Sequence, residues 1–308
     1  MKNILILLIP VLLIIGACKE RFSGVNFNPP PPGEQLYIDS TYQVSPVPSV
    51  EPKMVLLEDF TGVSCVNCPN ADAEDSTLHT IYPGQIASIC EFPSVQGLSG
   101  PPAGATTTQS FVISDASNNY DLLGGGLLGQ LPEDAFDRKI LPGQSIILQN
   151  NEVQWQGFVS GELAIAPPMN VDILSQSYNT TSGKLTVKIK VTYTSVVNVN
   201  NFISAAITED SIMEPQKSLG LPKPIANYMH NHVLRGFIFP ATGLQLTSSG
   251  THTAGDIYSP GNTYIVEFST YINTAVWVPA HCNIVAFVHD ESASSFQVYQ
   301  SAISRLQL

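Results

Sequence analysis

The chain has 308 residues, of which 44% are hydrophobic and only 12% are charged, a balance that excludes a charge-rich disordered chain and a Glu/Lys-rich coiled coil. Its 13 lysines and arginines stand against 25 aspartates and glutamates, and a formal net charge of −12 argues against a nucleic-acid partner because such a surface repels phosphates. The length favours two domains, and the 22 glycines and 23 prolines favour strands and turns over long helices.

The N-terminus predicts export. Lys2 precedes the apolar run Ile4–Ala17, which is too short to cross a bilayer of ~30 Å at ~1.5 Å per residue. Residues 1–17 are therefore expected to be a lipoprotein signal peptide. The run ends in Ile15-Gly16-Ala17-Cys18, which resembles the bacterial lipobox and implies that Cys18 carries a lipid. The alternative is an ordinary secretory cleavage after Ala17 with Cys18 beside it by chance.

Residues 18–50 are expected to form a proline-rich tether, because the run Pro29–Pro32 favours an extended polyproline form. No other segment of the sequence approaches eighteen consecutive apolar residues. We therefore expect membrane attachment through the N-terminal lipid only. No aspartate directly follows Cys18 to retain the protein at the inner membrane, so the sequence favours the outer membrane, facing the periplasm or the cell surface.

Residues 51–165 alternate strands with helices and form the first predicted domain. The sequence predicts strands at Met54–Phe60 and Ile86–Phe92, helices at Asn70–Ile81, Ser110–Leu123 and Glu152–Leu163, and a hairpin from Glu133–Ile140 and Ser145–Leu148. This order, with a Cys-x-x-Cys helix after the first strand, resembles the thioredoxin fold.

Residues 166–308 form the second predicted domain, which consists of strands. Lys184–Thr194 alternates cleanly between apolar and polar residues, which is typical of a strand with one buried face. Seven short strands suggest an immunoglobulin-like β-sandwich. The other six are Val171–Tyr178, Phe202–Glu209, Val233–Phe239, Tyr264–Thr270, Ile284–His289 and Gln297–Ile303. The expected fold class is therefore α/β plus all-β, a thioredoxin-like domain followed by the sandwich.

Cys65 and Cys68 are the strongest candidates for chemistry. A cysteine at a helix start meets unpaired N–H groups and the positive end of the helix dipole, which favour the thiolate. We expect Cys65 to be a partly exposed nucleophile and the shielded Cys68 to resolve a mixed disulfide. Pro69 suits the first turn of the helix because its missing N–H would have no helical partner.

The resemblance to thioredoxins implies two further site residues. A carboxylate six residues before the first cysteine lies buried beneath the pair in that fold and relays the resolving thiol's proton, and Asp59 has this spacing. The fold also places a cis-proline beside the disulfide, and Pro132 is the candidate. We therefore expect Asp59 to have a pKa raised by burial, and the Leu131–Pro132 bond to be cis.

Other interpretations of the cysteines remain open. The Cys65–Cys68 bond could be a permanent structural disulfide. A zinc site would need two more ligands, and His79 is the only nearby imidazole. Cys90 and Cys282 are expected to be buried apolar residues, although a disulfide between them is an alternative.

Two blocks of the sequence resemble the outer-membrane-protein-28-related family of Bacteroidota lipoproteins. The first block runs from Val55 to Pro69 and the second contains Ile207–Asp210, Gln216 and Tyr228–Arg235. This resemblance covers residues 51–308. It implies a thioredoxin-like domain joined to a β-rich domain on an exported lipoprotein, and it implies no particular substrate.

His230 and His232 are two residues apart, so on a strand both imidazoles would point to one face and could chelate a metal. Because no third ligand is adjacent in sequence, the preferred interpretation is hydrogen bonding at a domain junction. We therefore expect no metal and no cofactor.

The sequence favours thiol–disulfide exchange with envelope or surface proteins through Cys65 and Cys68. The absence of a tryptophan beside Cys65 and the large second domain favour the alternative, a binding or adhesin-like surface protein with a structural disulfide. A third possibility is an accessory subunit of an outer-membrane complex. The Val66-Asn67 dipeptide matches neither a reducing nor an oxidising signature, so the direction of exchange stays open.

Overall fold

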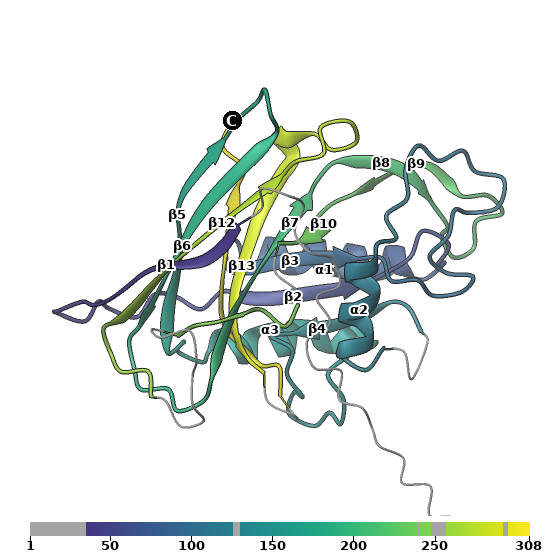
Figure 1. Cartoon of the computed structure of the whole chain (residues 1–308). Helices are drawn as coiled ribbons and strands as arrows, with labels where there is room; N and C mark the ends of the chain where they lie inside the picture. The colour runs from purple at the N-terminus through teal and green to yellow at the C-terminus, as the bar shows by residue number, and fades with distance from the viewer. Residues whose placement is uncertain (1–34, 126–129, 239–240, 248–256, 292–294) are drawn as a thin grey trace, which may run out of the picture.

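The structure, a computed structural model, describes residues 35–125, 130–238, 241–247, 257–291 and 295–308. It is a mixed α/β protein made mostly of sheets, with few helices (Figure 1). In chain order the elements are β1 (Gln35–Gln43), β2 (Val55–Phe60), α1 (Cys68–Ile81), β3 (Ile86–Glu91), α2 (Ser114–Leu122), β4 (Glu133–Phe136), the 3₁₀ turn η2 (Glu152–Gln154), α3 (Trp155–Leu163), β5 (Met169–Tyr178), β6 (Lys184–Tyr193), β7 (Asn201–Glu209), β8 (Ile212–Gln216), β9 (Ile225–His230), β10 (Val233–Phe237), β11 (Leu244–Gln245), β12 (Asn262–Tyr271), the 3₁₀ turn η3 (Pro279–His281), β13 (Cys282–Asp290) and β14 (Val298–Arg305).

The largest sheet combines strands from both halves of the chain. Its order is β14–β13–β7–β10–β3–β2–β4, with β11 paired to β7. The two halves meet where β10 runs parallel to β3, with Val233 opposite Cys90. The Cys90 N–H donates a hydrogen bond of 2.8 Å to the carbonyl of His232 at this junction. Residues 51–165 and 166–308, predicted as separate domains, therefore contribute to one continuous sheet.

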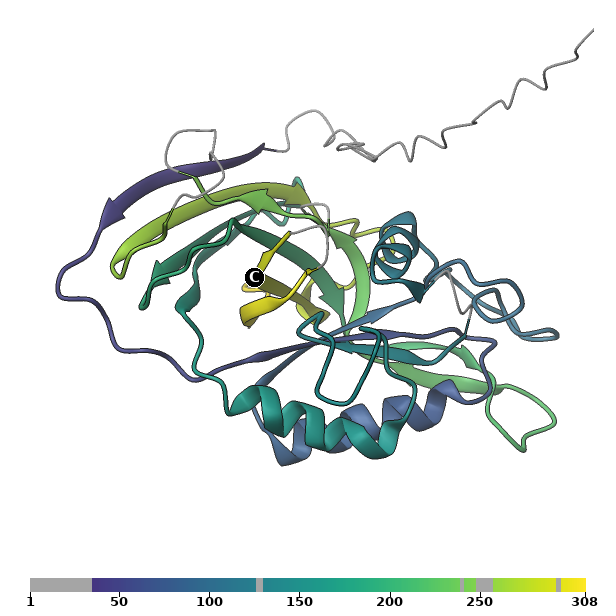
Figure 2. The same cartoon turned by 90° about the horizontal axis from the view of Figure 1, so that it is seen from below.

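Helices cover both faces of the β2–β3–β4 part of this sheet. Alternate residues of a strand point to opposite faces, so Leu57 packs with α1 and α3 around Trp155, whereas Leu56 packs with Ala116 of α2 on the other side. Figure 2 shows α1 and α3 along the same face. Because neither face meets water, every residue of β2 is buried, including its two carboxylates.

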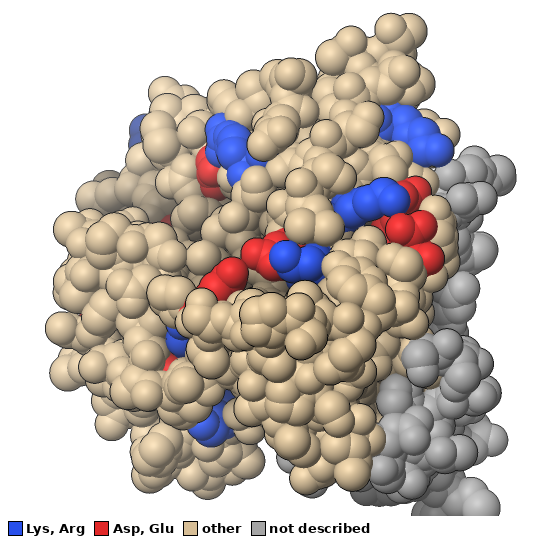
Figure 3. Space-filling model, turned by 90° about the vertical axis from the view of Figure 1, so that its left-hand side faces the viewer, with Lys and Arg blue, Asp and Glu red and all other residues tan. Residues whose placement is uncertain are grey.

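The second sheet is antiparallel, in the order β1–β12–β6–β5, and packs its inner face against β7 and β13. The alternation in β6 buries Val187 and Ile189 in this core and leaves Lys188 and Lys190 on the outer face. Lys188 forms ion pairs with residues of β1 and β12, and Lys190 forms one with β5. In Figure 3, which views this side of the molecule, the charged side chains gather in a narrow band on an otherwise largely uncharged surface.

Most predicted elements are present, with ends that differ by a few residues. The three predicted helices correspond to α1, α2 and α3, and the seven predicted strands of the C-terminal half to β5, β6, β7, β10, β12, β13 and β14. Predictions for residues 1–34, including Cys18, lie outside the described residues.

The tether prediction for residues 18–50 is wrong for Gln35–Gln43. This segment is β1, an edge strand that pairs along its length with β12. The alternation of Leu36 and Ile38 breaks at the irregularity in pairing between Ile38 and Ser40, so the sequence pattern is short. The backbone nevertheless pairs with β12, and the Tyr37 hydroxyl donates to Glu267.

The predicted hairpin after Pro132 is also shorter than expected. Only Glu133–Phe136 forms a strand, and the returning segment makes one antiparallel bridge, between Asp134 and Gln149. The prediction also missed β8, β9 and β11. The short β9 carries no regular apolar pattern, and its pairing with β8 is set by the tertiary structure.

Candidate functional site

Cys65 and Cys68 form a disulfide at the start of α1, with their Cα atoms 5.5 Å apart. The Cys68 N–H, which the helix leaves without a backbone acceptor, points to the Cys65 sulfur at 3.2 Å. Pro69 occupies the first turn, as expected. The sequence therefore places the pair at the positive end of the helix dipole.

The disulfide is buried beneath an exposed tip. The exposed fraction is 2% for Cys65 and 0% for Cys68, but it rises to 40% for Val66 between them. The prediction of a partly exposed Cys65 is therefore wrong, whereas that of a shielded Cys68 is confirmed. Access to the sulfurs requires movement of the residues around them.

Residues 216–219, which comprise the last residue of β8 and the segment after it, cover one side of the cysteine loop. The Gln216 side-chain amide donates to the carbonyls of Gly62 and Cys65 at 3.1 and 3.0 Å. The backbone N–H of Leu219 donates to the Val66 carbonyl at 2.8 Å. This segment from the C-terminal half therefore lies against the loop that holds the disulfide.

The other side of the loop packs against residues 98–100. Ser64 donates its backbone N–H to the Leu98 carbonyl at 2.8 Å and its hydroxyl to the Gly100 carbonyl at 2.7 Å. Gly62 allows this approach, since a Cβ there would lie 2.4 Å from the Leu98 oxygen. The two flanking segments explain why Cys65 is buried.

Pro132 lies beside the pair, as predicted. The Leu131–Pro132 bond is cis, and the Leu131 carbonyl oxygen is 3.5 Å from the Cys65 sulfur. Leu131 also packs with both cysteines in a small apolar cluster that contains Tyr120.

Asp59 is buried on β2, with an exposed fraction of 4%. The Cys90 thiol donates to its Oδ2 at 3.4 Å, and among the described residues its Oδ1 has no hydrogen-bond partner. Burial, followed by the nearby carboxylates of Asp72 and Asp75, raises the pKa of Asp59 well above its usual value. The predicted burial and pKa shift are confirmed, and the proposed proton relay stays a prediction.

A cavity of about 370 Å³ lies between α1 and the turn that joins β9 to β10. It is lined by Asp59, Pro69, Asp72, Ala73, Asp75, Ser76, His79, Cys90, Tyr228, Met229, His230, Asn231 and His232. Asp59 and Pro69, the neighbour of Cys68, line the same space. The cavity therefore brings the buried carboxylate to the residues around the disulfide.

The carboxylates and tyrosine on the cavity wall form a polar network. The Tyr228 hydroxyl donates to Asp72 at 2.7 Å. Burial raises the pKa of Asp72 to about 6, although this hydrogen bond opposes the shift. Asp72, Asp75 and His79 were not singled out as a group by sequence reasoning, yet their spacing of three and four residues on a predicted helix places them on one face.

His230 and His232 do not share one strand face. His230 ends β9 and packs between the rings of Phe92, Phe111 and Tyr228, where burial lowers its pKa to about 4. His232 lies in the turn with a φ of 56°. The predicted hydrogen bonding at the junction of the two halves is confirmed for His232, through its carbonyl and through its N–H, which donates to Asp210 at 2.9 Å.

The other two cysteines of the described residues are buried and free, so the alternative of a disulfide between Cys90 and Cys282 is wrong. Burial raises the pKa of the Cys90 thiol well above its usual value and that of Cys282 to about 12. Neither thiol is activated as a nucleophile.

Fold and site together define a mixed α/β protein with a buried Cys-x-x-Cys disulfide beside an acidic cavity. The sequence matches the family described as outer membrane protein Omp28 over residues 144–307, more than half of the chain. The chain belongs to this family of outer membrane proteins, which confirms the predicted family and the outer-membrane location. Within the described residues, no helix is both long enough and apolar enough to span a bilayer.

Solved structures with a similar fold include HBP35 of Porphyromonas gingivalis, with 12% identity and a TM-score of 0.57 over 83% of this chain and 76% of that chain. A protein of Agrobacterium tumefaciens has 13% identity and a TM-score of 0.45 over 84% and 99% of the two chains. A domain of the outer membrane lipoprotein Omp28 from Porphyromonas gingivalis has 18% identity and a TM-score of 0.28 over 46% and 89%. Among curated proteins, none matches the chain.

Proposed function

We propose that this outer-membrane protein exchanges thiols and disulfides with envelope or surface proteins, with Cys65 as the attacking thiol and Cys68 as the resolving thiol. The observation that carries the proposal is a disulfide at a helix start, next to a cavity that reaches the buried carboxylate of Asp59. The protein would be held at the membrane by a lipid on Cys18.

The proposal assigns residues 51–165 to a thioredoxin-like domain. Support comes from β2, which pairs parallel with β3 and antiparallel with β4, and from the disulfide at the start of the intervening helix α1. Residues 166–308 would form an immunoglobulin-like sandwich, supported by antiparallel pairing within each of its two facing groups of strands. This second part would present the cysteine pair to its partner.

The exchange has two steps. In the reduced protein, the Cys65 thiolate attacks a disulfide of the substrate, forms a mixed disulfide and releases one substrate thiolate. Cys68 then loses its proton, attacks the Cys65 sulfur, reforms the Cys65–Cys68 bond and releases the second substrate thiolate. The substrate is reduced and the pair is oxidised, and the reverse sequence oxidises a substrate dithiol.

Asp59 would take up the Cys68 proton in the second step. A carboxyl group with a raised pKa holds a proton more readily than an ordinary aspartate and can return it to the cavity. Its side chain would act on the proton of Cys68 rather than on the substrate.

A second candidate function is a binding or accessory surface protein in which the disulfide is structural. The burial of Cys65 and the hydrogen bonds from residues 216–219 favour it, because a substrate must displace part of this cover to reach the sulfur. In this case neither cysteine would form a mixed disulfide.

Reaction of single-cysteine variants with a defined peptide disulfide separates the two functions. Purified Cys68→Ala should form a mixed disulfide with the peptide, visible by mass spectrometry and reversed by reductant, and Cys65→Ala should not. Cys282→Ser, which keeps the pair and removes a buried thiol outside the cavity, should reduce the peptide like the wild type.

The structural alternative predicts different results. Neither cysteine variant would trap the peptide, the wild-type disulfide would resist reduction by glutathione, and Cys65→Ala and Cys68→Ala would lose similar small amounts of stability because the closed loop is short. These results together would refute thiol exchange.

Metabolic labelling tests the proposed lipid anchor. A fatty-acid analogue should label the wild type and not Cys18→Ala, and equal labelling would refute lipidation at Cys18.

A further inference from the structure

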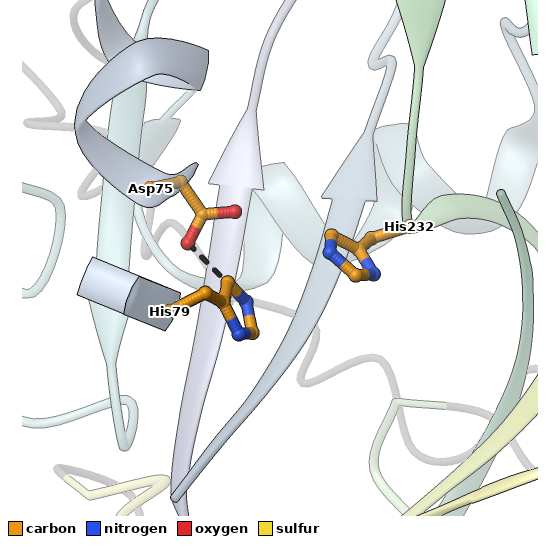
Figure 4. Close-up of side chains that lie close together, drawn as sticks. All are labelled: Asp75, His79 and His232. Atoms are coloured by element: carbon orange, nitrogen blue, oxygen red, sulfur yellow. Dashed lines mark ion pairs between the residues drawn. The ribbon is translucent and has the colours of Figure 1, made fainter. Parts of the chain in front are cut away.

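The acidic cavity contains a group of three side chains that can coordinate a metal ion. Asp75 and His79 lie one turn apart on α1, and His232 approaches from the turn between β9 and β10 (Figure 4). One potential ligand atom from each residue lies within 4.8 Å of the others. The two imidazole rings are stacked, with their centroids 5.1 Å apart.

The α1 part of this group is held in place by the helix and by β3. Residues four apart project from the same side of a helix, and the His79 Nε2 is 3.7 Å from an Asp75 carboxylate oxygen. The Ser88 hydroxyl of β3 lies 2.8 Å from the same nitrogen and donates to Asp75 at 3.2 Å. Asp75 and His79 therefore already face a common point.

His232 is held by an independent set of contacts. Its φ of 56° is uncommon for a residue other than glycine. Asp210 supports this conformation, since one of its oxygens accepts the His232 N–H at 2.9 Å and lies 3.3 Å from Nδ1. Asp210 is in turn fixed by Arg305 at 2.6 Å and Asn283 at 2.9 Å.

This arrangement matches a known design of metal sites. A histidine ligand is commonly oriented by a carboxylate at its second ring nitrogen, and Asp210 lies 3.3 Å from the His232 Nδ1, within ion-pair distance but without a hydrogen bond to that nitrogen. Two imidazoles and one carboxylate are also a donor set that Zn²⁺ accepts, with the fourth position left to water or another ligand. The remaining cavity volume provides space for that ligand.

We propose that Asp75, His79 and His232 bind one divalent transition-metal ion of the zinc type, with an open coordination position facing the cavity. Tetrahedral ligands at about 2.0–2.2 Å from Zn²⁺ are roughly 3.4 Å apart. Small side-chain rotations would bring the three potential ligand atoms from their present spacing, within 4.8 Å of one another, to this distance. The carboxylate of Asp72 on the same wall favours a cation over an anion in this space.

The site would join the two halves of the chain. Two ligands come from α1 and one from the turn before β10. This turn lies at the junction where the Cys90 backbone N–H donates a hydrogen bond to the His232 carbonyl. The proposal is independent of thiol exchange, because none of the three ligands belongs to the cysteine pair. The sequence alone predicts no metal because no third ligand lies beside His230 and His232, but the fold supplies Asp75 and His79 from the other half.

The test is titration of the purified, tag-free full chain with Zn²⁺ in competition with a chromophoric chelator. The wild type should bind one equivalent, and Co²⁺ in its place should give the visible absorption of a four-coordinate site. His79→Gln and His232→Asn should weaken Zn²⁺ affinity at least 100-fold. Asn is chosen at 232 because it tolerates a positive φ, so the turn should survive.

Two further variants test the assignment of the ligands. Asp210→Asn should weaken affinity about 10- to 100-fold, as expected for an outer partner of a metal ligand. Cys90→Ser, in the same cavity but outside the group, should bind Zn²⁺ like the wild type. Far-UV circular dichroism of each variant confirms folding before titration.

Three results would overturn the proposal. They are a wild type that binds no Zn²⁺ at micromolar concentration, folded His79→Gln and His232→Asn variants that bind as tightly as the wild type, and loss of binding in Cys90→Ser alone. The first would reduce the group to a hydrogen-bonded junction. The second and third results would show that the metal binds to other residues of the chain.

Discussion

Replacing Arg138 with methionine should destabilise the whole protein, because its guanidinium neutralises a carboxylate inside the large sheet. Arg138 follows β4 and contacts Glu58 of β2 through Nε at 2.8 Å and Nη2 at 2.6 Å, and both side chains are completely buried. Its Nη1 donates to the Ala241 carbonyl at 2.8 Å, and its guanidinium lies 4.7 Å from the ring centre of Phe287. One side chain thus links β2 to β13 and to the segment after β10.

The expected magnitude follows from what remains after the substitution. Glu58 keeps its hydrogen bond from Asn119 at 3.0 Å, but that amide also donates to Glu91. Removing one partner of a buried ion pair costs about 3–5 kcal/mol. Burial, followed by the neighbouring Glu58, raises the pKa of Glu91 well above its usual value. Arg138→Met should therefore lose about 3–5 kcal/mol, a large part of a typical stability of about 5–15 kcal/mol.

Urea unfolding at pH 7, followed by circular dichroism, measures this loss. The double variant Glu58→Gln/Arg138→Met should be more stable than Arg138→Met alone, because no unpaired charge remains inside. The stability of Arg138→Lys should lie between those of the wild type and Arg138→Met, since lysine keeps the positive charge but cannot make the bidentate hydrogen bonds to Glu58. A stability of Arg138→Met within about 0.5 kcal/mol of the wild type would refute the reasoning.

Three further predictions concern titration and cooperativity. Burial raises the pKa of Asp59, so the folded protein loses stability as pH rises from 3.8 through the folded-state pKa of this carboxyl group. Asp59→Asn should therefore gain stability relative to the wild type over this range, and a pH-independent difference in urea unfolding would contradict this. Burial, aided by Arg138, lowers the pKa of His289 from 6.5 to about 3, so the wild type should lose about 3 kcal/mol relative to His289→Gln between pH 6.5 and 4, and parallel stability curves would exclude it. Because the large sheet joins the two halves, the fluorescence of the remaining tryptophan and far-UV circular dichroism should unfold coincidently within each of the variants Trp277→Phe and Trp155→Phe, and separated midpoints within one variant would indicate two independent units.

The sequence predicted the elements whose residues carry a regular pattern. Val187 and Ile189 alternate with lysines in β6, and the run before Thr61 marks a strand buried on both faces. The disulfide at a helix start, the buried Asp59 and the cis bond before Pro132 also follow from local motifs and fold resemblance.

What the sequence could not predict depends on contacts between distant segments. No local pattern indicates that β10 lies beside β3, because a single pair, Val233 and Cys90, joins them. The burial of Cys65 depends on residues 216–219, and the meeting of His79 with His232 depends on the same junction. Such long-range pairings are selected by the packing of the whole fold rather than by the propensity of either segment.

The pairing of β1 with β12 also limits how far the protein can stand from its membrane. A tether of residues 18–50 could span roughly 110 Å when fully extended, at about 3.4 Å per residue. With Gln35–Gln43 fixed in the sheet, the chain from a lipid on Cys18 to the folded body spans at most about 60 Å. With the proposed lipid on Cys18, the start of β1 would therefore stay within this distance of the lipid headgroups.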